Sequence, residues 1–495
     1  MGQIAPVFGS IIPSQQQLAL QNNYLAFNAG ANDFAQQYLP EVYEAEVERY
    51  GNRTLNGFLR MVGAELPMTS DQVIWSEQNR LHVAYTNVNQ TGGAGSIQLE
   101  FALGGAPAVA NAVFPNDTIV VMNPTTGVTL KAVVRDSVPG GIGQRVRAYP
   151  FTAANFDALG VGATNLKMFV YGSIFAKGSA GPVDNAGTAN TYKSIQPQFT
   201  QYANNPIIIK DSFEINGSDM AQIGWVEVAT EDGTSGYLWY LKSESETRLR
   251  FDDYLEMAMV EGELATGAGG SSFAAQSANV PGFTAAGGAA VAYGTQGLFA
   301  AIQARGNIMA GFSAGTGLSD FDQVLKNLDT QGAIEENMLF LNRQLDLDFD
   351  DMLGQISAGV AGGVAYGLFE NSQDMALNLG FSGFRRGSYD FYKTSWKYLN
   401  DASTRGAVAV SNIEGVLIPA GTSTVYDQQL GTNIRRPFLH VRYRASQTED
   451  RRYKNWITGS AGGAYTTNLD AMQVNWLSER CLVTQAANNF VLFQN

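Results

Sequence analysis

The sequence predicts an α+β protein that is organised around one long helix. Residues 236–264 contain no proline and a single interior glycine, Gly262, and their apolar side chains recur at roughly helical spacing. Glycine-rich regions with short runs of β-forming residues lie on both sides of this segment. A helix of about 30 residues would be on the order of 45 Å long, severalfold longer than an ordinary helix. One such helix between two β-rich regions favours a flat, extended body.

Charge and hydrophobicity within this helix indicate a soluble element that packs on one side. Glu244 precedes Arg248 by four residues, as Glu246 precedes Arg250, and each pair adds a few tenths of a kcal/mol to helix stability. No heptad pattern persists, which argues against a coiled coil. Ten charged residues within 242–263 argue against a membrane span. The predicted apolar side comprises Leu238, Leu241, Leu249, Phe251, Tyr254, Leu255, Ala258 and Met259.

The composition is low in charge and high in glycine. Charged residues make up 15% of the chain, against about 25% in a typical soluble domain. Glycine contributes 54 of the 495 residues. A surface that is poor in charge and rich in small and amide side chains can be covered by other subunits without burying unpaired ions. We therefore expect a protein that works as an assembly of copies; a neutral secreted or adhesin-like protein is the alternative.

Net charge and cysteine content exclude several classes of protein. The net charge of −14 argues against tight, sequence-independent binding of nucleic acid by the chain as a whole. Cys481 is the single cysteine, so no disulfide can form within the chain, which fits a reducing compartment. The first residues lack the basic and apolar regions of a signal peptide, and no apolar run reaches 18 residues. We expect neither a signal peptide nor a transmembrane helix.

The region before the long helix combines an arm with β-structure. Residues 1–13 are apolar and bracketed by prolines, as in an extended arm, and 15–27 and 40–50 are predicted to be helical. Residues 71–88 have the composition of a strand. They are expected to form one arm of a long hairpin whose return arm is 194–215.

A separate β module interrupts this hairpin. Five short β-runs separated by turn signals lie between about 96 and 180, which fits a small antiparallel barrel or sandwich. The clearest turns are predicted at 123–127 and 139–141. The flanking segments 91–95 and 178–191 have the composition of linkers.

The region after the long helix predicts a compact α/β lobe. Residues 267–294 are almost uncharged but contain aromatic residues, which indicates an ordered contact loop. Ser319 is predicted to cap a helix, with Asp322 at its third position. Helices are predicted at 296–305, 319–329 and 346–356, and strands at 337–342, 377–399, 413–428, 438–445 and 481–493.

No catalytic or cofactor site is predicted. Residues 311–315 match the GxSxG pattern of serine hydrolases around Ser313, but 315–317 intervene where a helix should begin, and the downstream histidine, His440, has no carboxylate nearby in sequence. Two histidines and one cysteine cannot build a usual zinc site. The chain contains no P-loop pattern.

A cluster of aspartates resembles the start of a calcium-binding loop. Asp346, Asp348 and Asp350 are spaced as in an EF-hand, but Asp351 stands where glycine is needed and Ser357 where glutamate is needed. An acidic helix N-terminus explains the cluster better, with incidental cation binding as the alternative.

One basic cluster remains as a candidate interaction site. Residues 435–454 carry seven basic and two acidic residues, a net charge of +5. The arginines are expected to pair with acidic residues of a neighbouring subunit; a phosphate-facing patch is the second interpretation. The candidate residues are Arg435, Arg436, Arg442, Arg444, Arg451, Arg452 and Lys454.

The order of arm, hairpin, long helix, mixed lobe and final strand resembles the major capsid proteins of tailed bacteriophages with the Hong Kong 97-type fold. Three stretches carry the resemblance: NNPIIIKDSFEINGSDMAQIG at 204–224, SDFDQVLKNLDTQGAIEENMLFLN at 319–342 and EGVLIPAGTSTVYDQ at 414–428. The whole chain is most similar to the capsid proteins of crAss-like phages.

This resemblance implies a division of the chain and a function. It implies an N-terminal arm and first helices at 1–50, an E-loop hairpin and the start of a P-domain at 51–235 with the inserted module at about 91–190, a spine helix at 236–267, mostly an A-domain with P-domain excursions at 268–479, and a final P-domain strand at 480–495. The implied function is structural, without catalysis or cofactors: hexamers and pentamers assemble into an icosahedral shell that encloses double-stranded DNA.

The resemblance also implies partners and a location. The partners are other copies of the chain, a portal vertex, scaffolding and auxiliary or decoration proteins, and packaged DNA through non-specific contacts, with no membrane. The location is the virion, after assembly in the cytoplasm of a bacterial host. The alternative is a β-rich phage or cell-surface binding protein that recognises its partner through residues 96–180.

Overall fold

The computed structural model divides the chain into two compact units, one formed by residues 76–202 and the other by the segments on either side. It describes residues 64–78, 82, 84–101, 112–138, 145–178, 199–218, 220, 228–229, 235–236, 238–265, 273, 280–281, 293–311, 317–332, 334–359, 382–407, 412–420, 422–426, 433–463 and 465–495. The predicted arm and helices before residue 51, the turn predicted at 139–141, most of the loop at 267–294 and Ser313 lie outside these residues.

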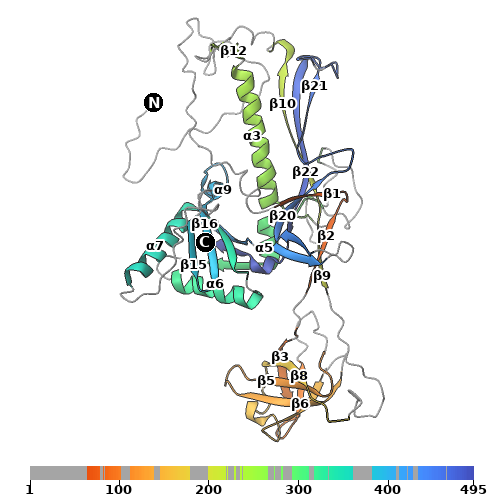
Figure 1. Cartoon of the computed structure of the whole chain (residues 1–495), viewed down its shortest axis with the longest axis vertical. Coiled ribbons are helices and arrows are strands. Elements are labelled where there is room, and N and C mark those ends of the chain that lie inside the picture. Colours follow the sequence, from red (N-terminus) through yellow and green to blue (C-terminus); the bar gives the residue numbers. More distant parts are fainter. Residues whose placement is uncertain are drawn as a thin grey trace. The chain divides into compact units, whose positions relative to one another are not determined.

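Residues 76–202 contain a closed, antiparallel, six-stranded barrel (Figure 1). Closure comes from the pairing of β8 with β3, which places Phe169 opposite Ala84. The barrel therefore has no open sheet edge, which settles the choice between barrel and sandwich. In barrel order the strands are β3 (Ala84–Thr91), β4 (Gln98–Phe101), β7 (Arg145–Pro150), β6 (Thr129–Val138), β5 (Asp117–Met122) and β8 (Leu166–Ser173).

The barrel has one strand more than predicted, because β3 belongs to it. From the sequence, the start of β3 was predicted to end the hairpin strand at 71–88, outside the β module between about 96 and 180. In the structure Tyr85 and Val88 of β3 are buried in the barrel interior, and the ring of Tyr85 lies 4.4 Å from that of Phe101. Only with β3 does the sheet close, and the short helix η2 (Asp157–Leu159) adds Leu159 to the same core.

Asn123 organises the turn between β5 and β6. Its Oδ1 accepts hydrogen bonds from the backbone N–H groups of Thr125 (2.9 Å) and Thr126 (3.3 Å), and its Nδ2 donates to the carbonyl of Leu159 (2.7 Å). Gly127 closes the turn at a φ of 73°, where glycine is favoured. The turn predicted at 123–127 is thus confirmed, and Asn123 also ties it to η2.

Replacing Asn123 by alanine is expected to destabilise the barrel by about 1–3 kcal/mol, because three backbone groups lose their partner. Thr125→Ala, at an exposed position of the same turn, should change stability by less than about 0.5 kcal/mol. Hydrogen exchange of the barrel strands of the full chain in rising urea, read by mass spectrometry, measures both. Equal exchange in the two variants would contradict the role of Asn123.

The second unit contains a five-stranded sheet built on one long strand, β22 (Ala471–Thr484). On one side β22 pairs with β10 (Ile207–Asn216). On its other side it pairs with β21 (Lys454–Gly459) and then with β20 (Leu439–Arg444), so β20 and β21 lie end to end. β1 (Ala64–Met68) pairs in parallel with β20.

The predicted long hairpin is only partly present. β2 (Val73–Gln78) pairs with β9 (Phe199–Asn204), and the boundaries of the barrel unit fall within these strands. The rest of the predicted return arm forms β10, which joins β22 instead. A strand pattern predicts extended backbone but does not identify the partner strand, so this pairing was wrong.

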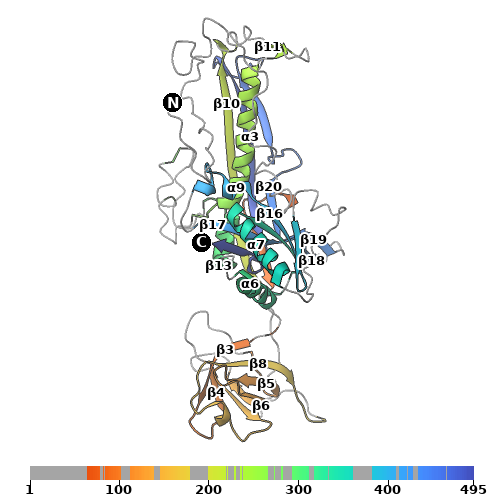
Figure 2. The ribbon, with the colours of Figure 1, turned by 90° about the vertical axis from the view of Figure 1, so that its left-hand side faces the viewer.

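The predicted long helix is present as α3 (Leu238–Glu261) and lies along β10 and β22 in both views (Figures 1 and 2). It ends earlier than expected, at Gly262. A Cβ atom on Gly262 would lie 2.6 Å from the carbonyl oxygens of Ala258 and Thr295, and the Gly262 carbonyl accepts a hydrogen bond from Gly297 N–H at 2.7 Å. The helix therefore ends at Gly262, where two backbone segments meet closely.

A six-stranded mixed sheet forms the core of the α/β lobe (Figure 2). α6 (Gly317–Gln331) and α7 (Arg343–Gly359) pack on one face through a cluster that includes Phe321, Phe349 and Phe391. The other face packs against α5 (Leu298–Arg305), α9 (Lys397–Asn400) and the end of α3. The strands in order are β13 (Asn307–Ala310), β23 (Val491–Gln494), β17 (Ile413–Pro419), β14 (Glu336–Leu341), β16 (Tyr389–Ser395) and β15 (Ser382–Arg386).

Two smaller pairings and two short helices complete the described elements. β18 (Thr422–Tyr426) pairs with β19 (Asn433–Pro437), β11 (Val228–Ala229) pairs with β12 (Ser235–Gly236), and η5 (Arg405–Ala407) and η6 (Ala487–Asn489) are 3₁₀ turns. The single strand predicted at 481–493 is the end of β22, η6 and β23, so the boundary predicted at residue 480 falls inside β22.

Two predicted helix starts in the lobe are wrong. α6 begins at Gly317, so Ser319 lies inside the helix instead of capping it. Asp322 instead forms a two-point ion pair with Arg386, with Nε–Oδ1 2.9 Å and Nη2–Oδ2 2.7 Å. α7 begins before the aspartates, and Asn342 caps it by accepting a hydrogen bond from Leu345 N–H at 2.7 Å.

Candidate assembly surfaces

One side of α3 is buried against the long sheet. Thr247, Phe251, Leu255 and Met259 recur at four-residue spacing and are all buried. Phe251 and Leu255 pack against residues of β10 and β22, among them Ile215, Met472, Val474 and Trp476. The ring of Phe251 also meets Tyr453 edge to face at 5.5 Å. This stripe attaches the helix to the sheet over much of its length.

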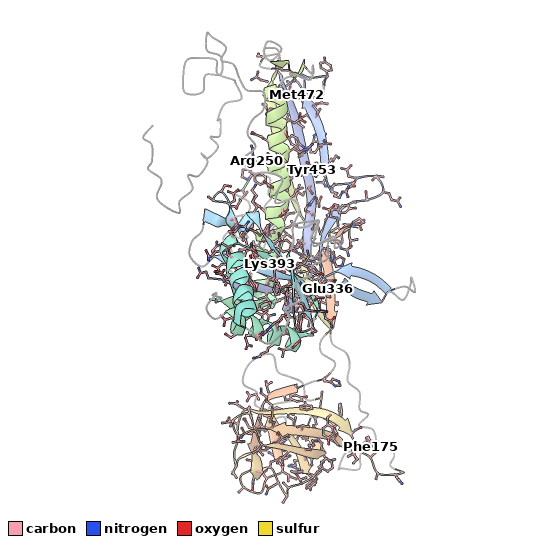
Figure 3. All side chains as sticks on the ribbon, turned by 60° about the vertical axis from the view of Figure 1, so that its left-hand side comes forward. Phe175, Arg250, Glu336, Lys393, Tyr453 and Met472 are labelled. Atoms are coloured by element: carbon pink, nitrogen blue, oxygen red, sulfur yellow. The ribbon has the colours of Figure 1, made fainter. Side chains whose placement is uncertain are left out.

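Two predicted members of the apolar side are partly exposed, Leu249 on the side away from the sheet and Tyr254 beside the buried stripe. Leu249 is 46% exposed and Tyr254 is 42% exposed, whereas Leu255 is buried as expected. Leu249 is two residues before Phe251, which is about 200° around the helix. The side chains of Leu238 and Leu241 lie outside the described residues. Arg250 likewise projects on the side of α3 away from Tyr453 and Met472 (Figure 3).

An ionic contact holds the C-terminal end of α3. Glu261 binds Arg405 through two contacts, Nε–Oε1 at 2.7 Å and Nη2–Oε2 at 2.9 Å. Tyr398 donates its hydroxyl hydrogen to the same carboxylate at 2.5 Å. Burial, followed by this hydrogen bond and the charge of Glu261, raises the pKa of Tyr398. The helix end is therefore linked to the segment between β16 and β17.

Two arginines of the predicted basic patch lie close together: Arg444 at the end of β20 and Arg451 shortly before β21. Arg444 and Arg451 both contact the buried Glu479 of β22, with Nε–Oε1 and Nε–Oε2 distances of 2.7 and 2.6 Å. Arg444 also pairs with Asp71. Two guanidinium groups compensate one buried carboxylate, as a buried charge requires.

The neighbouring basic residues are also paired within the chain. Glu65 lies 3.7 Å from Arg452 and 3.6 Å from Arg480, a buried arginine. Lys454 pairs with Glu449. Arg442 donates from Nη1 to the carbonyl of Pro67 at 3.3 Å. These contacts connect the β20–β21 junction to β1 and to the turn after it.

Five of the seven residues of the predicted basic patch lie together in the structure: Arg442, Arg444, Arg451, Arg452 and Lys454. Several of them pair with carboxylates that were not part of the prediction. Glu65, Asp71 and Glu479 are far from the patch in sequence or fall in another strand, so no local signal identified them. Arg452 and Lys454 are more exposed than Arg444 and Arg451. The side chains of Arg435 and Arg436 lie outside the described residues.

The aspartate cluster binds a lysine of the same chain. Lys393 of β16 reaches Asp346 Oδ1 at 2.8 Å and Asp350 Oδ1 at 2.7 Å, and Arg343 lies 3.1 Å from Asp346 Oδ2. Lys393 lies inside the lobe (Figure 3). Within the described residues no group of acidic, histidine or cysteine side chains could hold a metal ion. An internal ammonium therefore supplies the positive charge at this cluster.

The residues of the hydrolase pattern do not form a described site. Ser313 lies outside the described residues, and His440 is buried in β20 with Nδ1 3.1 Å from the Pro437 carbonyl oxygen. Among the described helices, none combines the length and the hydrophobicity that crossing a membrane requires.

The single cysteine is buried at the centre of the long sheet. Cys481 lies in β22 opposite Arg442 of β20. Burial raises the pKa of its thiol to about 12 from 9.0, and the nearby Arg442 charge opposes this rise. The thiol ionises at lower pH in the unfolded chain than in the folded one, so it contributes stability below about pH 9 that is lost between about pH 9 and 12.

We expect Cys481 to react with a thiol reagent only after the sheet unfolds. At pH 8 the folded chain should be modified by dithiobis-nitrobenzoate at least about 100-fold more slowly than the chain in guanidinium chloride, because the thiolate is the reactive form. Absorbance of the released thiolate measures this reaction. Equal rates in the two states would show that the sheet around β22 is open. Cys481→Ser should abolish the signal.

Comparison with solved structures finds similarity to structures from phages, among them phage capsids. No family model matches the chain, and no curated protein sequence matches it. A structure titled Microbacterium phage Oxtober96 aligns with 93% of this chain and 95% of its own at 12% identity and a TM-score of 0.35. The mature capsid of bacteriophage PhiM1 aligns over 94% of each chain at 7% identity and a TM-score of 0.36. The capsid structure of cyanophage P-SCSP1u aligns with 64% of this chain and 80% of its own, at 9% identity and a TM-score of 0.30.

Proposed function

We propose that this chain is the major capsid protein of a tailed bacteriophage, and that it assembles as hexamers and pentamers into an icosahedral shell around double-stranded DNA. The observation that carries the proposal is α3 lying along β10 and β22, with the barrel inserted in the chain before β10 and the mixed lobe formed after α3. This is the order of elements that the sequence resemblance implies. The Hong Kong 97-type division into E-loop, spine helix, P-domain and A-domain is part of the proposal.

The mechanism is mechanical. α3 is buried along the long sheet by Phe251 and Leu255, and the Glu261–Arg405 contact holds its C-terminal end to the lobe. A shell under internal pressure needs subunits in which force passes through packed elements. Each subunit would share several interfaces with its neighbours, and permanent interfaces commonly bury about 2,000 Å² or more. Low surface charge allows such contacts to exclude water without burying unpaired ions.

The exposed apolar residues of α3 and the basic patch are proposed contact sites. Leu249 and Tyr254 offer apolar surface on a rigid element. Arg452 and Lys454 keep solvent contact in the single chain and could pair with acidic groups of a neighbour or with packaged DNA. Proposed further partners are a portal vertex, scaffolding proteins and auxiliary or decoration proteins, in a virion assembled in the bacterial cytoplasm. No catalytic activity and no cofactor is proposed.

Electron microscopy of the purified full-length chain in negative stain tests this function. We expect shells, tubes or ring-shaped hexamers and pentamers above a threshold protein concentration. Discrete small oligomers at all concentrations would contradict the proposal and would favour a β-rich binding protein that recognises its partner through the barrel. Deletion of residues 1–30, which lie outside the described residues, should leave folded subunits that assemble poorly.

A further inference from the structure

One outer face of the barrel carries large apolar side chains. Barrels normally alternate apolar residues inside with polar residues outside. Here Tyr149, Phe151, Phe169, Tyr171, Ile174 and Phe175 are between 40% and 52% exposed. Phe175 lies beyond β8, at the periphery of the barrel (Figure 3). Taking about 200 Å² for each large side chain, this is on the order of 500 Å² of exposed surface, the size of the largest apolar patch on a typical monomer, which is often functional.

Strand register shows that these residues form one patch. In one row Phe169 of β8 lies opposite Val120 of β5, Val120 lies opposite Lys131 of β6, and the N–H of Phe151 bonds to the Lys131 carbonyl at 2.9 Å. Neighbouring strands are about 4.8 Å apart, so this row spans roughly 15 Å.

A second row lies beside the first. Tyr149 lies opposite Val133 of β6, and Val133 lies opposite Thr118 of β5. Residues on the same face of the sheet alternate along each strand, so Val133 and Lys131 belong to the same outer face. Thr118 lies opposite Gly172 of β8, and the neighbouring Tyr171 falls at a register shift, two residues after Phe169, and is 49% exposed. These residues together make the aromatic patch, which we define by Tyr149, Phe151, Phe169 and Tyr171.

The charges around the aromatic patch are basic on balance, since Asp136 lies between two arginines, 3.7 Å from Arg135 and 3.6 Å from Arg147. Lys131 lies within it, Arg135 donates to the Tyr149 hydroxyl at 3.3 Å, and Lys167 is exposed on β8 two residues before Phe169. The barrel unit as a whole also differs in charge from the rest of the chain. Residues 76–202 contain eight Lys or Arg and six Asp or Glu, a net charge of +2, which leaves −16 for the remaining residues.

We propose that the aromatic patch docks on the acidic unit of a second copy of this chain. The inference rests on the proposed function, because it specifies one of the contacts between subunits. A basic rim around an apolar centre fits a surface of opposite charge. In an assembly of copies, each barrel is surrounded by the acidic units of neighbouring copies, which carry that opposite charge. Pairing of two barrels through the same patch would place Lys131 and Arg135 of one against those of the other, and like charges disfavour it.

The area agrees with this assignment. One side of a standard protein interface covers about 800 Å², with an apolar centre and a polar rim. The four side chains of the aromatic patch, each about half exposed, supply roughly 400 Å² of apolar surface, about half of one such side, and tyrosine and phenylalanine are enriched at the centres of such interfaces.

Site-specific photo-crosslinking of the full-length chain tests the proposal. A benzoylphenylalanine is placed at position 169, and copies with natural and heavy isotopes are mixed so that links between copies are distinguished by mass. We expect links that join two copies and end outside residues 76–202 of the second copy. The same probe at position 161, in an exposed loop of the barrel before β8, is the matched control and should give severalfold fewer such links.

Substitutions of the basic residues and of the aromatic residues test the two parts of the proposed contact separately. Lys131→Glu with Arg135→Glu should reduce the links from position 169, whereas Lys131→Arg should preserve them. Phe151→Ser with Tyr171→Ser should raise the assembly threshold by about tenfold or more, since buried aromatic anchors dominate interface energy. Val161→Ser should leave the threshold unchanged.

The outcomes separate this inference from the proposed function. Shells in the microscope with links confined to one copy, to a second barrel, or no more frequent than at position 161 would overturn the docking and leave the capsid function standing. Absence of any shell or capsomer would overturn the function and the docking with it.

Discussion

Replacing Phe251 by alanine is expected to lower the stability of the unit that contains α3 by about 3–5 kcal/mol. Phe251 is fully buried between α3 and the long sheet, where it packs with Trp476 and meets the ring of Tyr453. Alanine would remove the apolar contacts and leave a cavity, because the helix and the sheet are both rigid and cannot close around it.

Leu249→Ala is the matched control for Phe251→Ala. It is an apolar truncation on the same helix, two residues away, at a side chain that is 46% exposed in the single chain. We expect a change within about 0.5–1 kcal/mol. The proposed function adds a second expectation: Leu249→Ala should weaken assembly more than it weakens folding, if the exposed side of α3 contacts a neighbour.

Cys481 provides the measurement for both variants. It lies in β22, within the sheet that α3 covers, and it is the single cysteine of the chain. The guanidinium concentration at which unassembled subunits become reactive toward a thiol reagent reports unfolding of this sheet. The same shift in both variants would show that Phe251 does not anchor the helix. Hydrogen exchange in the barrel should not change with either substitution, because the barrel is a separate unit.

Replacing Lys393 by methionine is expected to cost about 3 kcal/mol of stability in the α/β lobe. The Lys393 side chain is 4% exposed and binds Asp346 and Asp350 at 2.8 and 2.7 Å. Methionine fills a similar volume but leaves the Asp346 carboxylate in a buried position with Arg343 as its remaining ionic partner in the described contacts. The cost comes more from the carboxylate that loses its buried partner and keeps only the half-exposed Arg343 than from the lost attraction.

Two further variants separate these causes. Lys393→Met combined with Asp346→Asn should recover part of the stability, because the buried charge is then removed together with its partner. Asp350→Asn should cost less than about 1 kcal/mol, since the Asp350 side chain is 57% exposed and water can replace the contact. Hydrogen exchange in α7 under rising denaturant measures each effect. A double variant that is no more stable than Lys393→Met alone would contradict the account.

The aspartate cluster shows how far local sequence carries the interpretation. The spacing of Asp346, Asp348 and Asp350 resembled an EF-hand, but Asp351 and Ser357 argued against one and the acidic run indicated a helix N-terminus. The helix α7 begins three residues before Asp346, at Arg343. No property of that segment identifies Lys393 as the partner, because Lys393 is 43 residues beyond Asp350 and reaches it only through the pairing of β16 with β14. Sheet topology brings the opposite charges together.

The barrel shows a similar limit for strands. The β-runs and the turn at 123–127 were readable, since alternation and turn residues act over a few positions. The sixth strand was not assigned to the barrel, because β3 reads as an ordinary strand and nothing in its own residues shows that β4 and β8 are its neighbours. Closure is a property of the whole sheet.

By itself the sequence determined the long helix, the β module, most helices of the lobe and a composition suited to contact between copies, because propensity, periodicity and charge are properties of neighbouring residues. The tertiary structure alone decided which side of α3 is buried, with Phe251 inside and Leu249 outside, and where the helix ends at Gly262. It also decided that Glu479 of β22 compensates Arg444 and Arg451. These outcomes depend on strands and backbone segments that meet only in the folded chain, and the energy of burying a group is set by what surrounds it there.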